Sequence, residues 1–364
     1  MLINDLSARI QAKKQALSAS IDRVIDSGWV VLGPEVRNFE AGFASYNNCA
    51  HCVSLANGTD AIELGLRAFG VKPGDKVATV ANAGMYTTTA ILSIGADPFF
   101  IDVDLQTKNT TLCEVQRAIQ AGVYAVVLTH LYGLATPEIF EIRDACRAGG
   151  VFILEDCAQA HGAVIEGHRV GSIGDIGSFS FYPTKNLGAL GDGGAIITGS
   201  TTFADRVRQL RQYGWSTKYH VAMPGARNSR LDEMQAAILS VFLPDLDRMN
   251  AKRRSIAQMY NQGIKNPLVI VPVDIGDNYV GHLYVVRAQE RDSLKAHLLN
   301  AGIASETHYP VPDHHQTIFG SRYQTISLPN TDQLSAEILT LPCYPEMSDD
   351  QVNFVINAVN AWAP

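Results

Sequence analysis

The sequence predicts an α/β protein, with a large domain built on a mostly parallel sheet and a smaller α+β domain after it. The chain has 364 residues, about twice the usual length of one domain. Its first 250 residues alternate short apolar runs with helical patterns, and the rest does not. Hydrophobic residues make up 46% of the chain and charged residues 18%, which suits a large core and excludes disorder.

Short apolar runs predict the first five strands, at 52–55, 76–80, 98–102, 124–129 and 151–155. The intervening helical patterns lie at 60–69, 87–96, 112–121 and 137–149. Strands that are apolar throughout and alternate with helices indicate a parallel sheet covered on both faces. Right-handed crossovers bring the carboxyl ends of these strands to one edge, where open α/β sheets bind ligands.

After residue 155 the pattern changes, because a Gly-rich loop rather than a helix separates the next two strand candidates, 177–184 and 193–199. Further helices are expected at 203–214, from Leu231 to about Met249, at 253–263, at 292–302 and from about Ser348. Further strands are expected at 268–273 and 282–288. The predicted domains are therefore 1–245, which is large, and 246–364, which is small.

Charge and composition exclude several partners. The net charge is −7, from 29 Lys and Arg against 36 Asp and Glu, so binding to nucleic acid is not expected. No segment supplies the roughly 18 apolar residues of a membrane span, and the start does not resemble a signal peptide. We therefore expect a cytoplasmic protein without a membrane partner. No metal site is expected, since Cys49 and Cys52 lack a second ligand pair. His314-His315 is either a metal site or plain surface, and we interpret it as surface.

Three segments carry possible chemistry at the predicted ligand-binding edge. Residues 56–61 (ANGTDA) end a strand and open a helix, where free N–H groups and a hydroxyl can cradle a phosphate. A simple helix cap explains that segment equally well by itself. Asp156 follows the strand at 151–155, and a buried carboxylate needs a partner. That partner is either a protonated cofactor ring nitrogen, or a helix cap or an arginine.

Lys185 lies in the third segment, 178–188 (SFSFYPTKNLG), between apolar strands and glycine turns. A desolvated lysine has a lowered pKa and forms imines with aldehydes. A phosphate cradle, an acid for a pyridinium and a lysine for an aldehyde are the three handles of pyridoxal 5′-phosphate. The three segments together therefore predict this cofactor.

On these residues the chain resembles the DegT/DnrJ/EryC1/StrS family of nucleotide-sugar aminotransferases. The likeness covers nearly the whole chain, and its most specific parts are SFYPTKNLG at 180–188 and NSRLDE at 228–233. The resemblance implies the fold of aspartate aminotransferase, that is, a fold-type I pyridoxal-phosphate transferase. Lys185 then looks like the Schiff-base lysine and proton shuttle, and Asp156 like the pyridinium partner.

The resemblance also implies the other cofactor-binding residues. Gly58, Thr59 and Ser180 look like phosphate ligands, and Gln159 looks like the hydrogen-bond partner of the ring hydroxyl. Asn228 resembles an asparagine that reaches the phosphate in the active site of a second subunit. A homodimer with shared active sites follows. The chain departs from the family at Gly84, where an aromatic residue usually stacks on the cofactor ring. Tyr86 is expected to replace it, with Met85 as the alternative.

The activity implied is transfer of an amino group from glutamate, leaving 2-oxoglutarate, to a nucleotide-linked keto-6-deoxyhexose, with a dTDP sugar as the expected substrate. The product would be an amino sugar for lipopolysaccharide, O-antigen or another glycan. Lys218-Tyr219-His220 and His308-Tyr309-Pro310 favour amination at C3, and C4 is the alternative. The candidate substrate residues are His161, Tyr182, Tyr219, His308 and Tyr309.

Three other functions are alternatives to this one. Family members that are dehydratases carry histidine in place of the lysine, and Lys185 argues against that activity. A non-catalytic regulator that binds the cofactor or the sugar would not need the complete set of site residues. An oxidoreductase would need a Gly-rich dinucleotide fingerprint, which is absent from the sequence.

Overall fold

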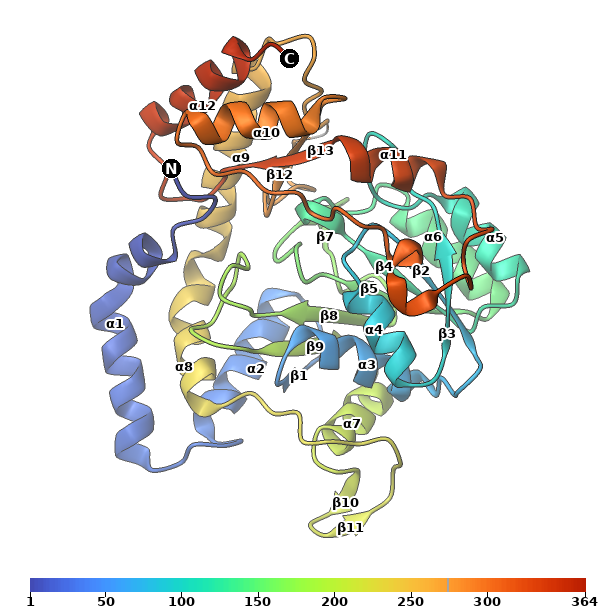
Figure 1. Ribbon diagram of the computed structural model, residues 1–364. Helices are drawn as coiled ribbons and strands as arrows, with labels where there is room; N and C mark the ends of the chain where they lie inside the picture. The colour runs from blue at the N-terminus through green and yellow to red at the C-terminus, as the bar shows by residue number, and fades with distance from the viewer. Residues whose placement is uncertain (274) are drawn as a thin grey trace.

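The computed structural model describes residues 1–273 and 275–364, and a seven-stranded sheet lies at its centre (Figure 1). The strands are β1 (His51–Leu55), β2 (Lys76–Val80), β3 (Asp97–Ile101), β4 (Ala125–Thr129), β5 (Phe152–Asp156), β8 (Ile176–Ser180) and β9 (Gly194–Thr198). Their order in space is β1-β9-β8-β5-β4-β2-β3. All neighbours pair in parallel except β9, which is antiparallel to both β1 and β8. The prediction of a mostly parallel sheet is confirmed.

Helices cover both faces of this sheet. Those that follow the strands are α3 (Gly58–Phe69), α4 (Tyr86–Ser93), α5 (Leu112–Gln120), α6 (Ile139–Gly149) and α7 (Thr201–Leu210). Side chains alternate along a strand, so Ala125 and Val127 of β4 pack with α3, α4 and α7, whereas Val126 and Leu128 pack with α5 and α6. All four of these residues are fully buried, as expected for a strand between two helical layers.

The sheet end formed by β1, β9 and β8 is covered by α1 (Leu6–Ser27), α2 (Pro34–Tyr46) and α8 (Glu233–Phe242). Here the rings of Phe43 and Phe179 meet edge to face with centroids 5.0 Å apart. The sequence predicted one helix from Leu231 to about Met249, which is wrong. The helix ends at Phe242, and a 3-10 turn, η2 (Leu243–Asp245), precedes α9 (Leu246–Gly263). Pro244 explains the break, because it has no N–H and fixes its own φ.

The carboxyl-terminal part surrounds a two-stranded antiparallel sheet of β12 (Tyr284–Arg287) and β13 (Ile338–Leu341). Three helices pack around one apolar cluster on it: α9, α10 (Arg291–Asn300) and α12 (Asp349–Ala361). α11 (Pro329–Glu337) leads into β13. The strand expected at 268–273 is reduced to one bridge, between Ile270 and Arg287. The division of the chain at residue 245 stays a prediction.

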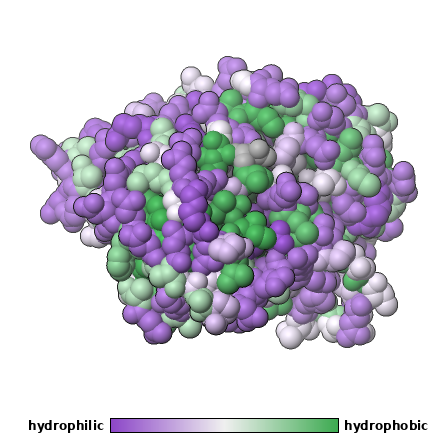
Figure 2. All heavy atoms as spheres, turned by 90° about the horizontal axis from the view of Figure 1, so that it is seen from above, coloured by the Kyte–Doolittle hydropathy of each residue, from purple (hydrophilic) through white to green (hydrophobic). Residues whose placement is uncertain are grey.

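Two short ribbons project from this framework: β6 (Val164–Ile165) with β7 (His168–Arg169), and β10 (Trp215–Thr217) with β11 (His220–Val221). Figure 2 looks down on the carboxyl-terminal part, where apolar side chains gather near the middle of a mostly hydrophilic face. Within the described residues, no helix combines the length and the apolar character that crossing a membrane requires.

Candidate active site

A cavity of about 850 Å³ opens at the carboxyl edge of the sheet. Thr129, Asp156 and Ser180, the last residues of β4, β5 and β8, all line it. This is the edge that the strand pattern predicted. The predicted site residues that line the cavity are Gly58, Thr59, Tyr86, Asp156, Gln159, Ser180, Tyr182, Lys185, His308 and Tyr309. His161, Tyr219 and Asn228 do not line it.

The start of α3 forms one end of the cavity. Asn57 is the N-cap, and its side chain accepts a hydrogen bond from the N–H of Asp60 at 2.8 Å. The N–H groups of Gly58 and Thr59 belong to the first turn, so they have no partner within the helix. A Cβ at Gly58 would lie 2.6 Å from that of Ser180, so only glycine permits this approach. Amide donors and a hydroxyl thus converge at a helix N-terminus, which is the geometry of a phosphate site.

Asp156 ends β5 with a buried carboxylate. Its Oδ1 accepts the N–H of Ala158 at 3.1 Å, and the Thr87 hydroxyl lies 3.4 Å from its Oδ2. Burial raises the pKa of Asp156, while the Ala158 N–H and the charge of Lys185 oppose the rise. Among the described residues no Lys or Arg forms an ion pair with it. The carboxylate therefore has room for a positively charged partner inside the cavity.

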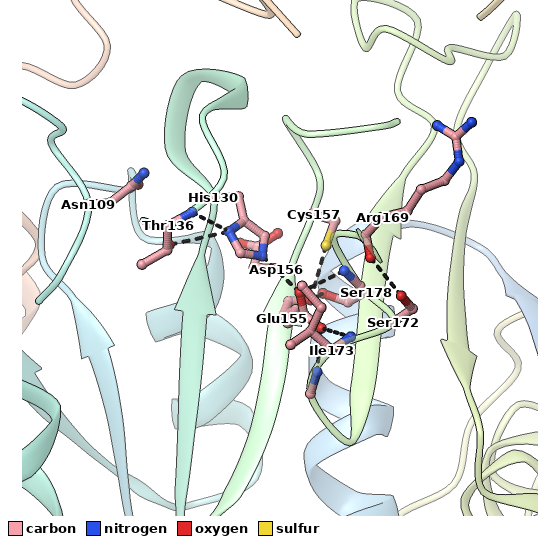
Figure 3. Close-up of polar contacts among 12 residues, drawn as sticks. Asn109, His130, Thr136, Glu155, Asp156, Cys157, Arg169, Ser172, Ile173 and Ser178 are labelled. Atoms are coloured by element: carbon pink, nitrogen blue, oxygen red, sulfur yellow. Dashed lines mark hydrogen bonds and ion pairs between the residues drawn. The ribbon is translucent and has the colours of Figure 1, made fainter. Parts of the chain in front are cut away.

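The preceding residue, Glu155, does not line the cavity, and its contacts hold the strand end in place (Figure 3). Its carboxylate accepts the N–H groups of Gly171, Ile173 and Gly174 at 2.6–2.8 Å. His130 Nε2 lies 3.0 Å from the same carboxylate. His130 Nδ1 accepts a hydrogen bond from the N–H of Thr136. Nε2 must therefore carry the ring proton and donate a hydrogen bond to Glu155. This buried network fixes the end of β5, and with it Asp156.

Lys185 lies in the loop between β8 and β9. Its own N–H donates to the oxygen of Tyr182 at 2.8 Å, and its carbonyl accepts from the guanidinium of Arg9 at 3.1 Å. Burial lowers the pKa of Lys185 to about 8, and the carboxylate of Asp156 partly opposes the shift. The amine is therefore partly neutral near neutral pH, as a nucleophile for an aldehyde must be.

Gln159 and Tyr309 both line the cavity and contact each other. Nε2 of Gln159 donates to the Tyr309 hydroxyl at 3.1 Å, and its Oε1 accepts the N–H of Tyr132 at 2.7 Å. The Tyr309 ring lies beside Gly84, where a Cβ would come within 2.8 Å of it. Tyr309 thus occupies the space that a side chain at position 84 would fill. The sequence had assigned Tyr309 only to the sugar.

Tyr86, the predicted stacking residue, lines the cavity and is 54% exposed. It contacts the ring of Tyr309 edge to face, with centroids 5.9 Å apart. Met85 instead packs toward the cluster around Phe100, away from the cavity. Of the two candidates in the sequence, Tyr86 is therefore the one that the structure brings to the cavity.

Two of the predicted substrate residues are not where we expected them. His161 is fully buried beside the rings of Phe179 and Phe181, and burial lowers its pKa to about 3. It is a neutral core residue, and the prediction that it lines the sugar pocket is wrong. Tyr219 is 75% exposed on the β10–β11 ribbon and does not reach the cavity of its own chain.

The other predicted residues are spread around the mouth and the surface. His308 lines the cavity, with Nδ1 2.9 Å from the Thr340 hydroxyl and Nε2 3.4 Å from Glu306. Tyr182 also lines it and is half exposed. Asn228 is exposed and pairs with Gln212, outside the cavity of its own chain.

Several lining residues were not predicted as site residues. Asn57 and Thr184 lie inside the motifs at 56–61 and 178–188, next to residues that were predicted for the site. The local sequence could therefore have indicated both of them. Ile3, Asn4, Glu306, Thr340 and Cys343 come from the chain start and from around β13. Only the packing of these segments over the sheet edge brings them to the cavity, and no local pattern indicates it.

The cavity fits pyridoxal phosphate on its own geometry. The helix start with its required glycine suits the phosphate, the buried Asp156 suits a ring nitrogen, and Lys185 suits the aldehyde. A mostly parallel sheet with these groups at its carboxyl edge defines the class of pyridoxal-phosphate-dependent enzymes.

Comparison with known proteins gives the family. The sequence signature described as the DegT/DnrJ/EryC1/StrS aminotransferase family matches residues 11–360. The chain is 41% identical to a dTDP-3-amino-3,6-dideoxy-alpha-D-galactopyranose transaminase of Aneurinibacillus thermoaerophilus, over 96% of each chain. It is 39% identical to a pleiotropic regulatory protein of Geobacillus stearothermophilus, over 98% of this chain and 96% of that one. The crystal structure of S. venezuelae DesV matches with a TM-score of 0.96 and 38% identity, covering 99% of this chain and 98% of that one.

The chain belongs to the DegT/DnrJ/EryC1/StrS aminotransferase family. It is a sugar aminotransferase that depends on pyridoxal phosphate. The resemblance and the fold class predicted from the sequence are both confirmed.

Proposed function

We propose that this enzyme transfers the amino group of glutamate to C3 of a dTDP-linked keto-6-deoxyhexose, in the biosynthesis of an amino sugar. The observation that carries the proposal is the presence of Lys185 and Asp156 in one cavity with the α3 phosphate cradle. The 41% identity to a transaminase that is named for a dTDP-3-amino sugar supports C3. Amination at C4 is the alternative within the same chemistry.

Lys185 is assigned the proton transfers. Because the pKa of its amine is about 8, both protonation states are populated near neutral pH, as a group that takes and returns a proton requires. Asp156 is assigned the ring nitrogen, and its negative charge would keep a proton there. Pyridoxal phosphate, when bound, supplies the electron sink for removal of the proton next to the amine.

The acidic wall of the cavity supports a second subunit at the site. Asp156, Asp192 and Glu306 line the cavity, and in the described part of the chain Lys185 is its one Lys or Arg. A sugar linked to a nucleoside diphosphate brings further negative charge, which needs donors or cations. The exposed Asn228 and Tyr219 are available for the cavity of a partner. We therefore propose a homodimer with shared active sites.

A cytoplasmic location is part of the same proposal. All six cysteines are free, including the exposed Cys113, and reduced thiols are typical of the cytoplasm. Glutamate as the amino donor is likewise proposed, from the resemblance described above.

The test is a reaction with glutamate and a small panel of dTDP- and UDP-linked 3-keto and 4-keto sugars, with the new amine located by NMR. The proposal expects an amine at C3 of a dTDP sugar and formation of 2-oxoglutarate. An amine only at C4 overturns the assignment of the carbon, and a UDP product overturns the assignment of the nucleotide.

A regulatory role is the second candidate, because one relative is named a pleiotropic regulatory protein. The complete set of Asp156, Gln159 and Lys185 in the cavity favours catalysis. Lys185→Ala separates the two roles. Loss of the biological activity together with turnover supports the enzyme, whereas activity that survives without turnover supports the regulator.

A further inference from the structure

A second cluster of possible metal ligands lies outside the active site. His314 and His315 end the short turn η3 (Asp313–His315), and Asp332 lies in the first turn of α11. One donor atom from each side chain lies within 4.8 Å of the other two. The loop between η3 and α11 brings them together, and its Phe319 and Tyr323 pack on Phe100 of β3. The cluster is thus built on a packed segment.

The spacing of the donor atoms suits a metal ion. Oδ1 of Asp332 lies 2.9 Å from Nε2 of His315 and 3.4 Å from Nε2 of His314. Around a tetrahedral ion with bonds of about 2.1 Å, neighbouring donors lie about 3.4 Å apart. The two distances to Asp332 are therefore within about half an ångström of this spacing, and the donor atoms of the two histidines lie no more than 4.8 Å apart.

His314 was expected on the surface, but its side chain is fully buried. Within residues 1–273 and 275–364, neither of its ring nitrogens has a hydrogen-bond partner, because the 3.4 Å contact to Asp332 lacks hydrogen-bond geometry. A buried polar group without a partner costs free energy.

A comparison within the molecule shows what is unusual here. His130, Glu155 and Cys157 form another cluster with metal-ligand spacing. There the carboxylate and both ring nitrogens are already used by hydrogen bonds within the protein. The histidine and the carboxylate of that cluster are thus already engaged within the protein, whereas both ring nitrogens of His314 are unused.

We propose that His314, His315 and Asp332 bind one divalent transition-metal ion. Two imidazoles and a carboxylate suit Zn²⁺, and Ni²⁺ or Cu²⁺ would also bind such a set. His315 and Asp332 are 48% and 44% exposed, so water reaches the fourth position. The cluster lies outside the cavity, so the ion has a structural role.

The position of the cluster indicates what such an ion would stabilise. Asp313, next to His314, accepts the N–H of Met85 at 2.9 Å and the hydroxyl of Thr88 at 2.5 Å. Its own N–H donates to the oxygen of Ala81 at 2.7 Å. The turn η3 therefore holds the segment that carries Tyr86 to the cavity. An ion joining η3 to α11 would fix this wall.

The test uses tag-free holoenzyme that has been treated with a chelator and then dialysed against micromolar Zn²⁺. The proposal expects about one zinc per chain by elemental analysis and a rise in Tm on adding zinc. His315→Ala and Asp332→Asn change exposed side chains, and each is expected to weaken binding by roughly tenfold or more and to remove the rise in Tm. His168→Ala, an exposed histidine on β7, is the matched control and should bind like the wild type.

Two results would overturn the proposal. One is a wild-type protein that retains no zinc. The other is equal retention of zinc by the wild type, His315→Ala and Asp332→Asn, which would place the metal elsewhere, for example on the exposed Cys113.

Discussion

The guanidinium of Arg9 donates a hydrogen bond to the main-chain oxygen of Lys185 at 3.1 Å, across 176 residues of sequence. It also donates to the oxygen of Gly188 at 3.3 Å and lies over the ring of Phe242. Burial lowers the pKa of Arg9 to about 10, which still leaves it charged at neutral pH. The first helix of the chain thus fixes the loop that carries the reactive lysine.

Arg9→Met removes both hydrogen bonds and keeps much of the side-chain volume. Hydrogen bonds from a charged group contribute about 1.5–3 kcal/mol, so we expect the free energy of unfolding to fall by about 2 kcal/mol. Transamination should slow as well, because Lys185 is held less well. Urea unfolding and steady-state kinetics measure the two effects.

Lys14→Met is the control, since Lys14 is exposed on the same helix. A surface change of this kind is expected to stay within about 0.5 kcal/mol. Equal effects of Arg9→Met and Lys14→Met would contradict the positioning role of Arg9.

The rate at which the apoenzyme takes up pyridoxal phosphate should follow the pKa of Lys185. Only the neutral amine attacks an aldehyde, so the rate should rise with pH and reach half of its maximum near pH 8. The unfolded chain keeps this proton up to about pH 10.5. Between pH 8 and 10.5 the unfolded chain therefore binds more protons than the folded chain does. The free energy of unfolding consequently rises with pH over this range, because burying Lys185 costs less once its amine is neutral.

Absorbance after rapid mixing gives this profile. Asp156 raises the pKa of Lys185, so Asp156→Asn should move the midpoint to lower pH. A midpoint near 10.5 in the wild type would mean that the amine is not desolvated.

Gly84→Ala should damage the cavity by displacing the ring of Tyr309. The added Cβ would lie 2.8 Å from that ring, and the backbone φ at Gly84 is +78°. Backbone strain of about 1–2 kcal/mol and overpacking of about 1–3 kcal/mol should both lower the free energy of unfolding. Cofactor affinity should fall with it. Urea unfolding and cofactor titration measure the losses.

Gly74→Ala separates strain from the clash. Its φ is +84°, and nothing lies within 4 Å of the added Cβ, so only the strain remains. Tyr309→Leu should partly relieve Gly84→Ala in the double variant, as residues in contact are not additive. Full additivity would show that Tyr309 does not occupy this space in solution.

Glu155→Gln should destabilise the protein strongly although it leaves the cavity lining unchanged. The amide would turn donors toward a site where three N–H groups and His130 all donate. Removing one partner from a buried charged network costs about 3–5 kcal/mol. Urea unfolding should show that loss, whereas Glu141→Gln, exposed on α6, should change little. Equal stabilities would contradict the network.

The sheet and the reactive pair could be predicted because both depend on local patterns. Five apolar runs indicated the parallel strands, and Asp156 and Lys185 follow strands whose ends share one edge. His161 could not be placed, because Phe179 and Phe181 bury it from another part of the chain. For the same reason His314 was expected on the surface, although its side chain is buried and its ring lies near that of Phe100 of β3.

Other parts of the site depend on contacts that no sequence pattern records. Ile3, Thr340 and Cys343 reach the cavity only after the chain start and β13 have packed over the sheet edge. Gly84 leaves space for the ring of Tyr309, which comes from a distant part of the chain. Long-range packing therefore completes a cavity whose reactive groups local sequence already indicates.

The most direct test of the account is to reduce the holoenzyme with borohydride and locate the attached cofactor by peptide mass spectrometry. We predict one phosphopyridoxyl group on Lys185, no label in Lys185→Ala, and less label after incubation with glutamate. Lys108 is a useful internal reference, because burial lowers its pKa to about 8 as well. Label on Lys108 instead of Lys185, or no label on any lysine, would contradict the account.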